Sequence, residues 1–308
     1  MIFMVRKIKK PAKECCVCGK PVCSIHSMYC QTHARLAFRM KARRFPPEAE
    51  EAVWNYIRAN GDRCYYTRLA LEMDDTKSQW FCVFDHLIPL DPRTIVLTSA
   101  LINEIKSALT EKEFWYFVEQ LADFKTNGKK IKKIQLGHWR KRFPGEKRKG
   151  SREEHCLAQP KWKGKHKKCC LCGRPVFVLR SKYCLRCSRF NHRMELKGFS
   201  PEVMEAIREH IRTKGYVCSF TGLPLDMDND RSPWYGVFSY LTPKDASKIV
   251  LTCALFNEMK SDLSIKEFWY YIRQLANYKR NHSPIRKKKL VYWYRLTPQE
   301  LRLKSLRD

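Results

Sequence analysis

The sequence predicts an α+β protein built from two tandem copies of one unit, each opening with a cysteine-rich knuckle. Three observations predict this. CCVCGKPV at 15–22 returns as CCLCGRPV at 169–176, 154 residues later, and the same offset carries KEFWY at 112–116 onto KEFWY at 266–270. Paired cysteines recur in each copy at metal-ligand spacing. Apolar residues at helical spacing alternate with β-branched runs such as IVLT at 95–98 and 249–252.

The duplication sets the domain boundaries that we expect. Repeat 1 covers residues 13–145 and repeat 2 covers residues 167–299, with a basic linker at 146–166 and a basic tail at 300–308. Each copy is long enough to fold as a domain. Two copies in one chain can imitate a homodimer with two similar binding faces. We therefore expect a pseudo-dimeric monomer or a subunit of a larger ribonucleoprotein.

Composition narrows the classes of protein. Lys and Arg number 61 against 31 Asp and Glu, a formal net charge of +30, which points to a polyanionic partner such as nucleic acid. A hydrophobic content of 44% excludes a wholly disordered chain, and no apolar run approaches a membrane span. The opening MIFMV is too short for a signal peptide, so 15 cysteines indicate metal ligation in a reducing compartment. We expect a cytoplasmic or nucleoid location, with an organelle as the alternative.

Each repeat contains one set of four candidate zinc ligands. Zn²⁺ prefers four sulfur or nitrogen ligands in a tetrahedron, which two paired turns supply. The last ligand differs between the copies, and histidine and cysteine share little except the ability to bind zinc. Cys16 and Cys170 are alternatives for the first ligand. We predict two structural zinc sites, formed by Cys15, Cys18, Cys30 and His33 and by Cys169, Cys172, Cys184 and Cys187.

Helix and strand signals follow each knuckle. Pro47 begins a helix that ends at Asn60-Gly61, and Ser200 caps a matching helix that Gly215 ends. Strands are expected at 80–84 and 95–98, with residues 85–90 turning the chain between them. A helix then places Leu101, Ile105 and Leu109 on one face. Another amphipathic helix holds Phe114, Trp115, Phe117, Val118 and Leu121.

Two strongly basic segments are candidate nucleic-acid contacts. Cations hold phosphates, and neighbouring aromatic rings stack on bases. A solvated linker and an ordinary docked tail are the alternative. The candidate contact residues are Lys129, Lys130, Lys132, Lys133, Arg140, Lys141, Arg142, Lys287, Lys288, Lys289, Tyr292 and Trp293.

The stretches FDHLIPL at 84–90 and TIVLTSALINEIKSALTEKEF at 94–114 resemble the HNH, or ββα-metal, endonucleases. The resemblance implies a strand carrying Asp-His, a second strand, and a helix carrying Asn-x-x-Lys. It implies that Asp85 and Asn103 bind Mg²⁺ or Mn²⁺, that His86 is the general base, and that Lys106 approaches the phosphate.

Repeat 2 departs from the family pattern. Ser239 and Tyr240 replace the carboxylate and the imidazole, so we expect it to be catalytically inactive. Repeat 1 departs as well, because its loop from Leu90 to Thr94 is short and lacks the family's middle Asn or His.

Three functions remain open from the sequence. The first is a metal-dependent DNA endonuclease of nicking or homing type, with one active centre in repeat 1 and duplex DNA as its substrate. The second is an inactive duplicate that binds structured RNA as a structural subunit of a ribonucleoprotein, such as an organellar ribosome. The third is a zinc-finger transcription regulator, disfavoured because no helix with base-reading residues is expected beside the knuckles. Convergence of Asp85, His86 and Asn103 on a divalent ion would distinguish the first from the second.

Overall fold

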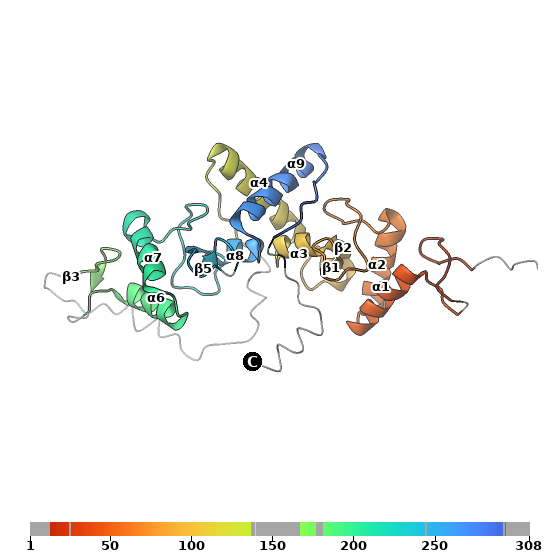
Figure 1. Cartoon of the computed structure of the whole chain (residues 1–308), viewed down its shortest axis with the longest axis horizontal. Coiled ribbons are helices and arrows are strands. Elements are labelled where there is room, and N and C mark those ends of the chain that lie inside the picture. Colours follow the sequence, from red (N-terminus) through yellow and green to blue (C-terminus); the bar gives the residue numbers. More distant parts are fainter. Residues whose placement is uncertain are drawn as a thin grey trace, which may run out of the picture. The chain divides into compact units, whose positions relative to one another are not determined.

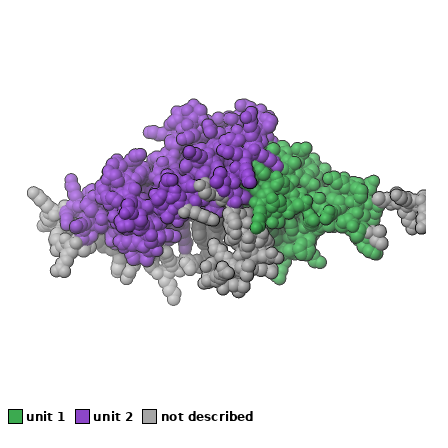
Figure 2. All heavy atoms as spheres, in the orientation of Figure 1, with its two compact units in different colours: residues 1–103, 294–308 green, residues 104–293 purple. Residues whose placement is uncertain are grey.

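The computed structural model of the chain describes residues 13–24, 26–136, 139, 167–176, 181–243, 245–291 and 293. These residues fall into two compact units, unit 1 up to Asn103 and unit 2 from Glu104 to Trp293 (Figure 2). The division falls inside a helix of repeat 1. The linker at 146–166 and the tail at 300–308 lie outside the described residues. The domain boundaries expected from the duplication therefore stay a prediction.

Unit 1 contains two helices and a hairpin, labelled in Figure 1. Strands β1 and β2 are antiparallel, and the register places Asp85 opposite Val96 and His86 opposite Ile95. Helix α3 follows β2 without a linking residue and crosses into unit 2, so the hairpin and helix have the ββα order expected. The elements are α1 (Gln31–Ala42), α2 (Pro47–Asn60), β1 (Cys82–His86), the 3₁₀ turn η1 (Pro92–Thr94), β2 (Ile95–Ser99) and α3 (Ala100–Lys106).

Unit 2 contains the last helix of repeat 1 and the described part of repeat 2. Its hairpin pairs Ser239 with Val250 and Tyr240 with Ile249, in the same register as in repeat 1. Among the helices of the described residues, none is both long and apolar enough to cross a membrane. The elements are α4 (Glu111–Asn127), β3 (Lys167–Lys168), β4 (Pro175–Val176), α6 (Leu185–Leu196), α7 (Pro201–Lys214), β5 (Gly236–Tyr240), β6 (Ile249–Cys253), α8 (Ala254–Lys260) and α9 (Ile265–Asn281).

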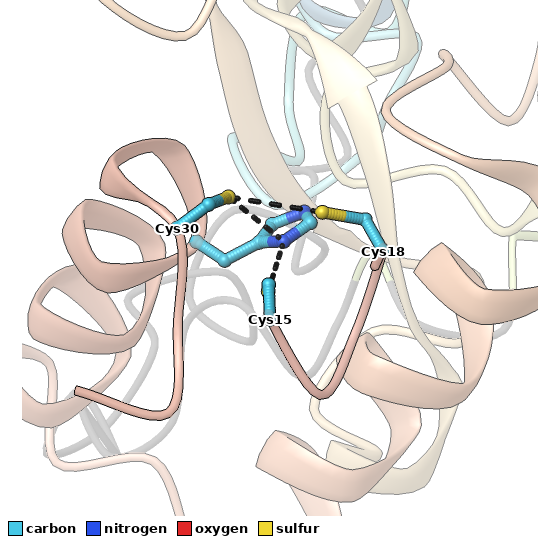
Figure 3. A group of neighbouring side chains, drawn as sticks. Cys15, Cys18 and Cys30 are labelled. Carbon is cyan, nitrogen blue, oxygen red and sulfur yellow. Dashed lines mark hydrogen bonds between the residues drawn. The ribbon is translucent and has the colours of Figure 1, made fainter. Parts of the chain in front are cut away.

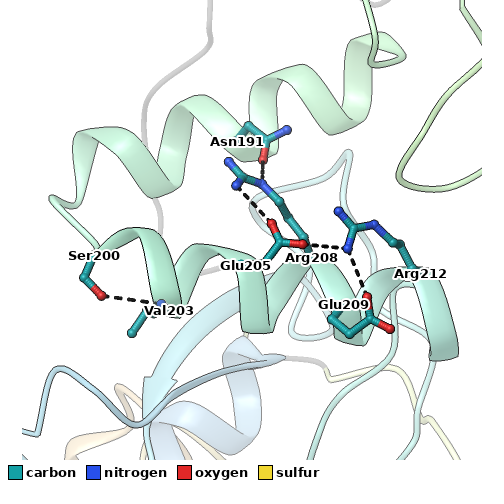
Figure 4. Close-up of polar contacts among 7 residues, drawn as sticks. All are labelled: Asn191, Ser200, Val203, Glu205, Arg208, Glu209 and Arg212. Atoms are coloured by element: carbon teal, nitrogen blue, oxygen red, sulfur yellow. Dashed lines mark hydrogen bonds and ion pairs between the residues drawn. The ribbon is translucent and has the colours of Figure 1, made fainter.

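Local signals account for most helix ends. The Ser200 hydroxyl accepts a hydrogen bond from the Val203 amide at the start of α7, as its sequence position predicts (Figure 4). Helices α4 and α9 each begin with a capping box, formed by Thr110 with Glu113 and by Ser264 with Glu267. These caps satisfy amide groups that have no partner inside the helix.

Two expected elements have different bounds in the structure. Strand β1 begins at Cys82 rather than at Trp80, and it includes Asp85 and His86, which were expected in the turn. Backbone pairing with Val96 and Ile95 extends the strand through these two polar residues. Helix α3 ends at Lys106, before Leu109, because Ser107 has a left-handed backbone with φ of 54°.

A helix that the sequence reading did not expect follows each knuckle. Helix α1 starts directly after Cys30 and α6 directly after Cys184. The N-cap residues, Cys30 and Cys184, make no side-chain hydrogen bond to the helix. Because cysteine is not a usual N-cap residue, no residue in the sequence signals that a helix starts here. Their buried residues share one pattern at positions i, i+3 and i+7: His33, Leu36 and Met40 in α1, and Cys187, Phe190 and Met194 in α6. Each knuckle is therefore followed directly by a helix. That these helices carry no base-reading residues stays a prediction.

Inside unit 2, helices α4 and α9 pack against each other (Figure 1). They occupy corresponding positions in the two repeats, and the contacts made by these helices and by the segments just before them are reciprocal. A reciprocal set of this kind is what a two-fold symmetric interface produces. The matched contacts are Ser107 donating to Glu258 and Ser261 donating to Glu104, both at 2.8 Å, and the ammonium groups of Lys125 over Trp269 and of Lys279 over Trp115.

Candidate metal centres and nucleic-acid interface

The first candidate metal centre is built by a tight turn and by the start of α1. The turn forms because the Gly19 amide donates to the Cys15 carbonyl and Gly19 adopts φ of 71°, a conformation that favours glycine. Cys30 immediately precedes α1, and His33 lies in its first turn. Figure 3 shows the side chains of Cys15, Cys18 and Cys30 directed toward one point together with the imidazole.

Distances within this cluster match a zinc tetrahedron. Zn–S bonds of about 2.3 Å and Zn–N bonds of about 2.0–2.1 Å imply S–S edges of about 3.8 Å and S–N edges of about 3.6 Å. The Cys18 and Cys30 sulfurs are 3.8 Å apart, and His33 Nδ1 lies 3.4 Å from the Cys15 sulfur and 3.5 Å from that of Cys30. The four side chains are therefore compatible with a structural Zn²⁺ site.

Repeat 2 builds the same centre with four cysteines. Its turn is closed by the same Gly173 amide to Cys169 carbonyl bond, and the sulfurs of Cys172 and Cys184 are 3.6 Å apart. The four ligand atoms lie within 4.8 Å of one another. Among the described residues, these two tetrads are the only groups of three or more His, Cys, Asp or Glu side chains placed to hold a metal. Cys16 and Cys170 are exposed and belong to neither tetrad.

Each fourth ligand has a matching partner behind it. Nε2 of His33 lies 3.1 Å from an Asp62 carboxylate oxygen, which directs Nδ1 toward the cysteines. In repeat 2, the Cys187 sulfur lies 2.9 Å from the Tyr216 hydroxyl, at the positions that correspond to His33 and Asp62. A carboxylate orients a ligating imidazole, whereas a hydroxyl donor stabilises a thiolate. The partner thus changes with the ligand that it supports.

Within each tetrad the thiol pKa values shift in both directions. Burial raises the pKa of the Cys15 thiol, but hydrogen bonds from the backbone, led by Cys30, and from His33 outweigh it and lower that pKa to about 6. Backbone hydrogen bonds, led by Cys184, similarly outweigh burial and lower the pKa of Cys169 to about 6. Burial raises the pKa of Cys18 to about 11 and raises that of Cys187 further. A divalent cation would stabilise the additional thiolates.

Asp85 and His86 lie at the end of β1, and Asn103 lies in α3. Asp85 is buried, with 6% of its surface exposed, and its carboxylate accepts a hydrogen bond of 2.7 Å from the Tyr66 hydroxyl. His86 is half-buried. The convergence of Asp85, His86 and Asn103 on one catalytic ion stays a prediction.

Repeat 2 has lost both members of this hydrogen bond. Phe220 and Ser239 stand at the positions of Tyr66 and Asp85. The Ser239 hydroxyl is buried, and no described residue hydrogen-bonds to it. The exchange therefore removes a buried carboxylate together with the hydroxyl that donates to it.

The lysines at the ends of α3 and α8 are buried. Lys106 is 1% exposed and Lys260 is 2% exposed. The Lys260 ammonium donates to the carbonyls of Leu263 at 2.7 Å and Ser261 at 3.2 Å. Burial lowers the pKa of Lys260. In repeat 2 this position closes the helix end, and the phosphate contact expected of Lys106 stays a prediction.

Two basic arms lie in unit 2, and each follows a long helix. Arm 1 is residues 131–136, after α4, and arm 2 is residues 285–290, after α9. Buried aliphatic side chains anchor both ends of each arm: Ile131 and Leu136 in arm 1, and Ile285 and Leu290 in arm 2. The residues Lys132, Lys133, Arg286, Lys287, Lys288 and Lys289 between these anchors are exposed, as are Lys129 and Lys130 just before arm 1.

In each arm, a tyrosine and a glutamine of the preceding helix hydrogen-bond to the backbone of one basic residue. In arm 1, the Tyr116 hydroxyl donates to the Lys132 carbonyl at 3.4 Å, and the Gln120 side-chain oxygen accepts from the Lys132 amide at 3.1 Å. Arm 2 repeats both bonds around Arg286, at 3.3 and 3.2 Å, from the side chains of Tyr270 and Gln274. These hydrogen bonds use only backbone atoms of the arms. The arms are therefore held in place without using their basic side chains.

Other predicted contact residues have different surroundings. The Lys133 ammonium donates to the Pro224 carbonyl and lies 5.3 Å from the centre of the Trp234 ring, and Lys129 pairs with Asp123 at 3.3 Å. Trp293 is half-buried. Arg140, Lys141, Arg142 and Tyr292 lie outside the described residues.

The sequence pointed to the eight candidate zinc ligands. It did not point to the residues that hydrogen-bond to the fourth ligands, or to the tyrosine–glutamine pairs that hold the arms. Asp62 and Tyr216 lie 29 residues after the ligands that they contact, with no motif linking them. The tyrosine–glutamine spacing at 116 and 120, repeated at 270 and 274, was a detectable signal.

The sequence matches no protein-family model, no curated protein and no solved structure. The resemblance to HNH endonucleases therefore rests on the quoted residues and on the ββα order alone.

Proposed function

We propose that this protein is a zinc-stabilised nucleic-acid-binding protein that holds phosphates on its two basic arms. The observation that carries the proposal is the pair of ordered basic arms in unit 2. Each arm is anchored at both ends by buried aliphatic residues and held by two side chains of the preceding helix. An ordered backbone reduces the entropy lost when its lysines and arginines bind a charged ligand.

The zinc centres have a structural role in this proposal. Four protein ligands fill a tetrahedral ion, so no position remains for a substrate or water. Two Zn²⁺ ions would join each turn to the helix that follows it, because Cys30 and His33 flank the start of α1, and Cys184 and Cys187 flank the start of α6. The knuckles therefore hold α1 and α6 in place.

Fluorescence anisotropy with labelled duplex DNA and with structured RNA, at increasing salt, tests the proposal. Lys130→Glu with Lys132→Glu should weaken binding through arm 1, and Arg286→Glu with Lys289→Glu through arm 2. Lys214→Glu, at an exposed lysine of α7, is the matched control. For DNA, each lost phosphate contact should reduce the slope of log affinity against log salt by about 0.9. Arm variants that behave like the control would contradict the proposal.

A second candidate function is metal-dependent cleavage of DNA by repeat 1. The ββα order of β1, β2 and α3 and the buried Asp85 favour it. In this reading, a Mg²⁺ or Mn²⁺ ion would polarise the scissile phosphate, and His86 would accept a proton from water. Asp85 and Asn103 are the oxygen donors that such an ion prefers.

A supercoiled-plasmid assay with Mg²⁺ or Mn²⁺ tests this second function. Nicking by the wild type should disappear in His86→Ala and persist in Tyr240→Ala, the change at the corresponding position of repeat 2. Tight binding of structured RNA without cleavage by either ion would reject the nuclease. That result would favour the structural subunit of a ribonucleoprotein.

A further inference from the structure

A groove beside the first knuckle has the features of a site for an unpaired nucleobase. It lies within unit 1, between α1 and residues 73–81, and has a volume of about 670 Å³. Sites for small molecules have volumes of about 300–1,000 Å³. The groove is therefore large enough for a single base with its sugar.

The groove combines an exposed ring with a fixed guanidinium. Phe38 is 73% exposed at its side, whereas Phe81 is buried in its wall. The Arg39 guanidinium lies 4.6 Å from the centre of the Phe81 ring and donates to the Cys82 carbonyl at 2.6 Å. An exposed phenylalanine of this kind is a stacking surface for a base of any sequence.

Charge indicates what kind of ligand would enter. Residues 31–47 contain five Arg or Lys residues and no acidic residue. Asp74 is the single acidic residue that lines the groove, and its carboxylate pairs with Arg35. Lys41 and Arg44 are exposed at the end of the same helix. An aromatic platform beside unbalanced positive charge is complementary to a single-stranded nucleic acid.

Repeat 2 lacks this combination at the corresponding helix. His192 and Glu195 stand at the positions of Phe38 and Lys41, and His192 Nδ1 lies 3.7 Å from a Glu195 carboxylate oxygen. The phenyl ring and one cation are thus replaced by a smaller imidazole ring and a negative charge. Helix α6 therefore serves as an internal control for α1.

We infer that the α1 groove binds an unpaired nucleobase by stacking on Phe38, with the adjoining phosphates held by the cations of α1. This inference rests on the proposed nucleic-acid function and gives it a preference for single strands or unpaired segments. Because the arms lie in unit 2 and the groove lies in unit 1, variants can separate the two contacts.

Anisotropy with the zinc-loaded full chain tests the inference, using an oligothymidylate of about 12 nucleotides and a duplex of equal length. Phe38→Ala should weaken oligothymidylate binding about five- to 150-fold, the equivalent of one lost stacking contact. Phe38→Trp should retain binding, and His192→Ala should leave it unchanged. Duplex affinity should be the same in all four proteins. Phe38 is mostly exposed, so its replacement should not unfold the chain.

Different failures have different meanings. Equal binding by Phe38→Ala and wild type, with weakening by the arm variants, rejects the groove and keeps the proposed function. Equal losses for oligothymidylate and duplex reject base stacking. Competition by polyglutamate as effective as that by oligothymidylate would assign the groove to acidic peptides. No binding of oligothymidylate, duplex or structured RNA by the wild type rejects the proposed function itself.

Photocrosslinking gives a readout that requires no variant. An oligonucleotide that carries a halogenated uracil should crosslink to peptides from residues 31–44. Crosslinks confined to residues 129–136 and 285–291 would overturn the inference.

Discussion

The two repeats share a framework but differ where side chains touch each other. In both, an arginine of the helix after the knuckle donates to the first carbonyl of the hairpin: Arg39 to Cys82 at 2.6 Å and Arg193 to Gly236 at 3.0 Å. Other contacts change as pairs. Repeat 1 has His33 with Asp62 and Tyr66 with Asp85. Repeat 2 has Cys187 with Tyr216, and it has Phe220 and Ser239 at the positions of Tyr66 and Asp85.

A single position differs between the repeats at the junction of two helices. In repeat 1, Trp54 of α2 lies edge-on to the His33 ring, 5.9 Å away. In repeat 2 the position of Trp54 is Arg208, whose guanidinium donates to Asn191 of α6 at 3.0 Å (Figure 4). The partner differs as well, because Asn191 corresponds to Ala37 and His33 corresponds to Cys187. The two repeats therefore join these helices through different contacts.

The largest expected effect comes from removing one zinc ligand. Cys172→Ser should lower bound zinc from two ions per chain to one and unfold the second knuckle with the start of α6. Structural zinc contributes on the order of 10 kcal/mol in isolated fingers. Metal analysis and circular dichroism measure both effects. Cys170→Ser, at the exposed neighbouring cysteine, should retain two ions. Full zinc content in Cys172→Ser would show that the tetrad is not the site.

A smaller effect should follow from changing the residues behind the ligands. Asp62→Ala should lower zinc affinity at the first site, and Tyr216→Phe at the second, by about 10- to 100-fold each. Titration against a chromophoric chelator measures this affinity. His33→Cys with Asp62→Tyr copies repeat 2 into repeat 1 and should recover affinity lost in His33→Cys alone. No recovery would mean that ligand and partner are independent.

The buried hydrogen bond between Tyr66 and Asp85 tests whether the differences between the repeats are energetically coupled. Tyr66→Phe leaves the Asp85 carboxylate buried without that donor, so the free energy of unfolding should fall by about 1–3 kcal/mol. Tyr66→Phe with Asp85→Ser, the residues of repeat 2, should cost less than the sum of the single changes. Urea unfolding measures all three variants. Strict additivity would show that the two side chains are not coupled.

The smallest effect concerns an ion pair that breaks the symmetry of α4 and α9. Arg280 lies 2.7 Å from Asp123, whose counterpart in repeat 2 is Asn277. Hydrogen bonds from Arg280 and then Lys129 outweigh burial and lower the pKa of the Asp123 carboxyl. The pair is partly exposed, so Asp123→Asn should cost no more than about 1 kcal/mol near pH 7.

The pH dependence of this pair has a definite sign. The lowered pKa means that its stabilisation is present above the unfolded-state pKa of about 3.9 and is lost as pH falls through the folded-state value. The difference in unfolding free energy between wild type and Asp123→Asn should therefore shrink in acid and in high salt. A difference that grows as pH falls would contradict this assignment.

The sequence predicted well wherever a local rule decides the structure. Ligand spacing identified both tetrads, because zinc geometry limits the separation of paired cysteines. Proline and glycine placed both ends of α2 at Pro47 and Asn60. The sequence predicted less well where tertiary contacts determine the bounds or the presence of an element. Pairing with β2 draws Asp85 and His86 into a strand, and α1 is held by its buried face and starts without a capping side chain.

The packing of α4 on α9 also bears on how the protein behaves on dilution. A noncovalent dimer with this interface would separate below its dissociation constant, whereas here both helices belong to one chain. After one arm binds a long polyanion, the other arm meets it at an effective concentration that reaches the millimolar range for short flexible connections. The gain in avidity depends on the polyanion spanning both arms, so short oligonucleotides should dissociate much faster than long ones.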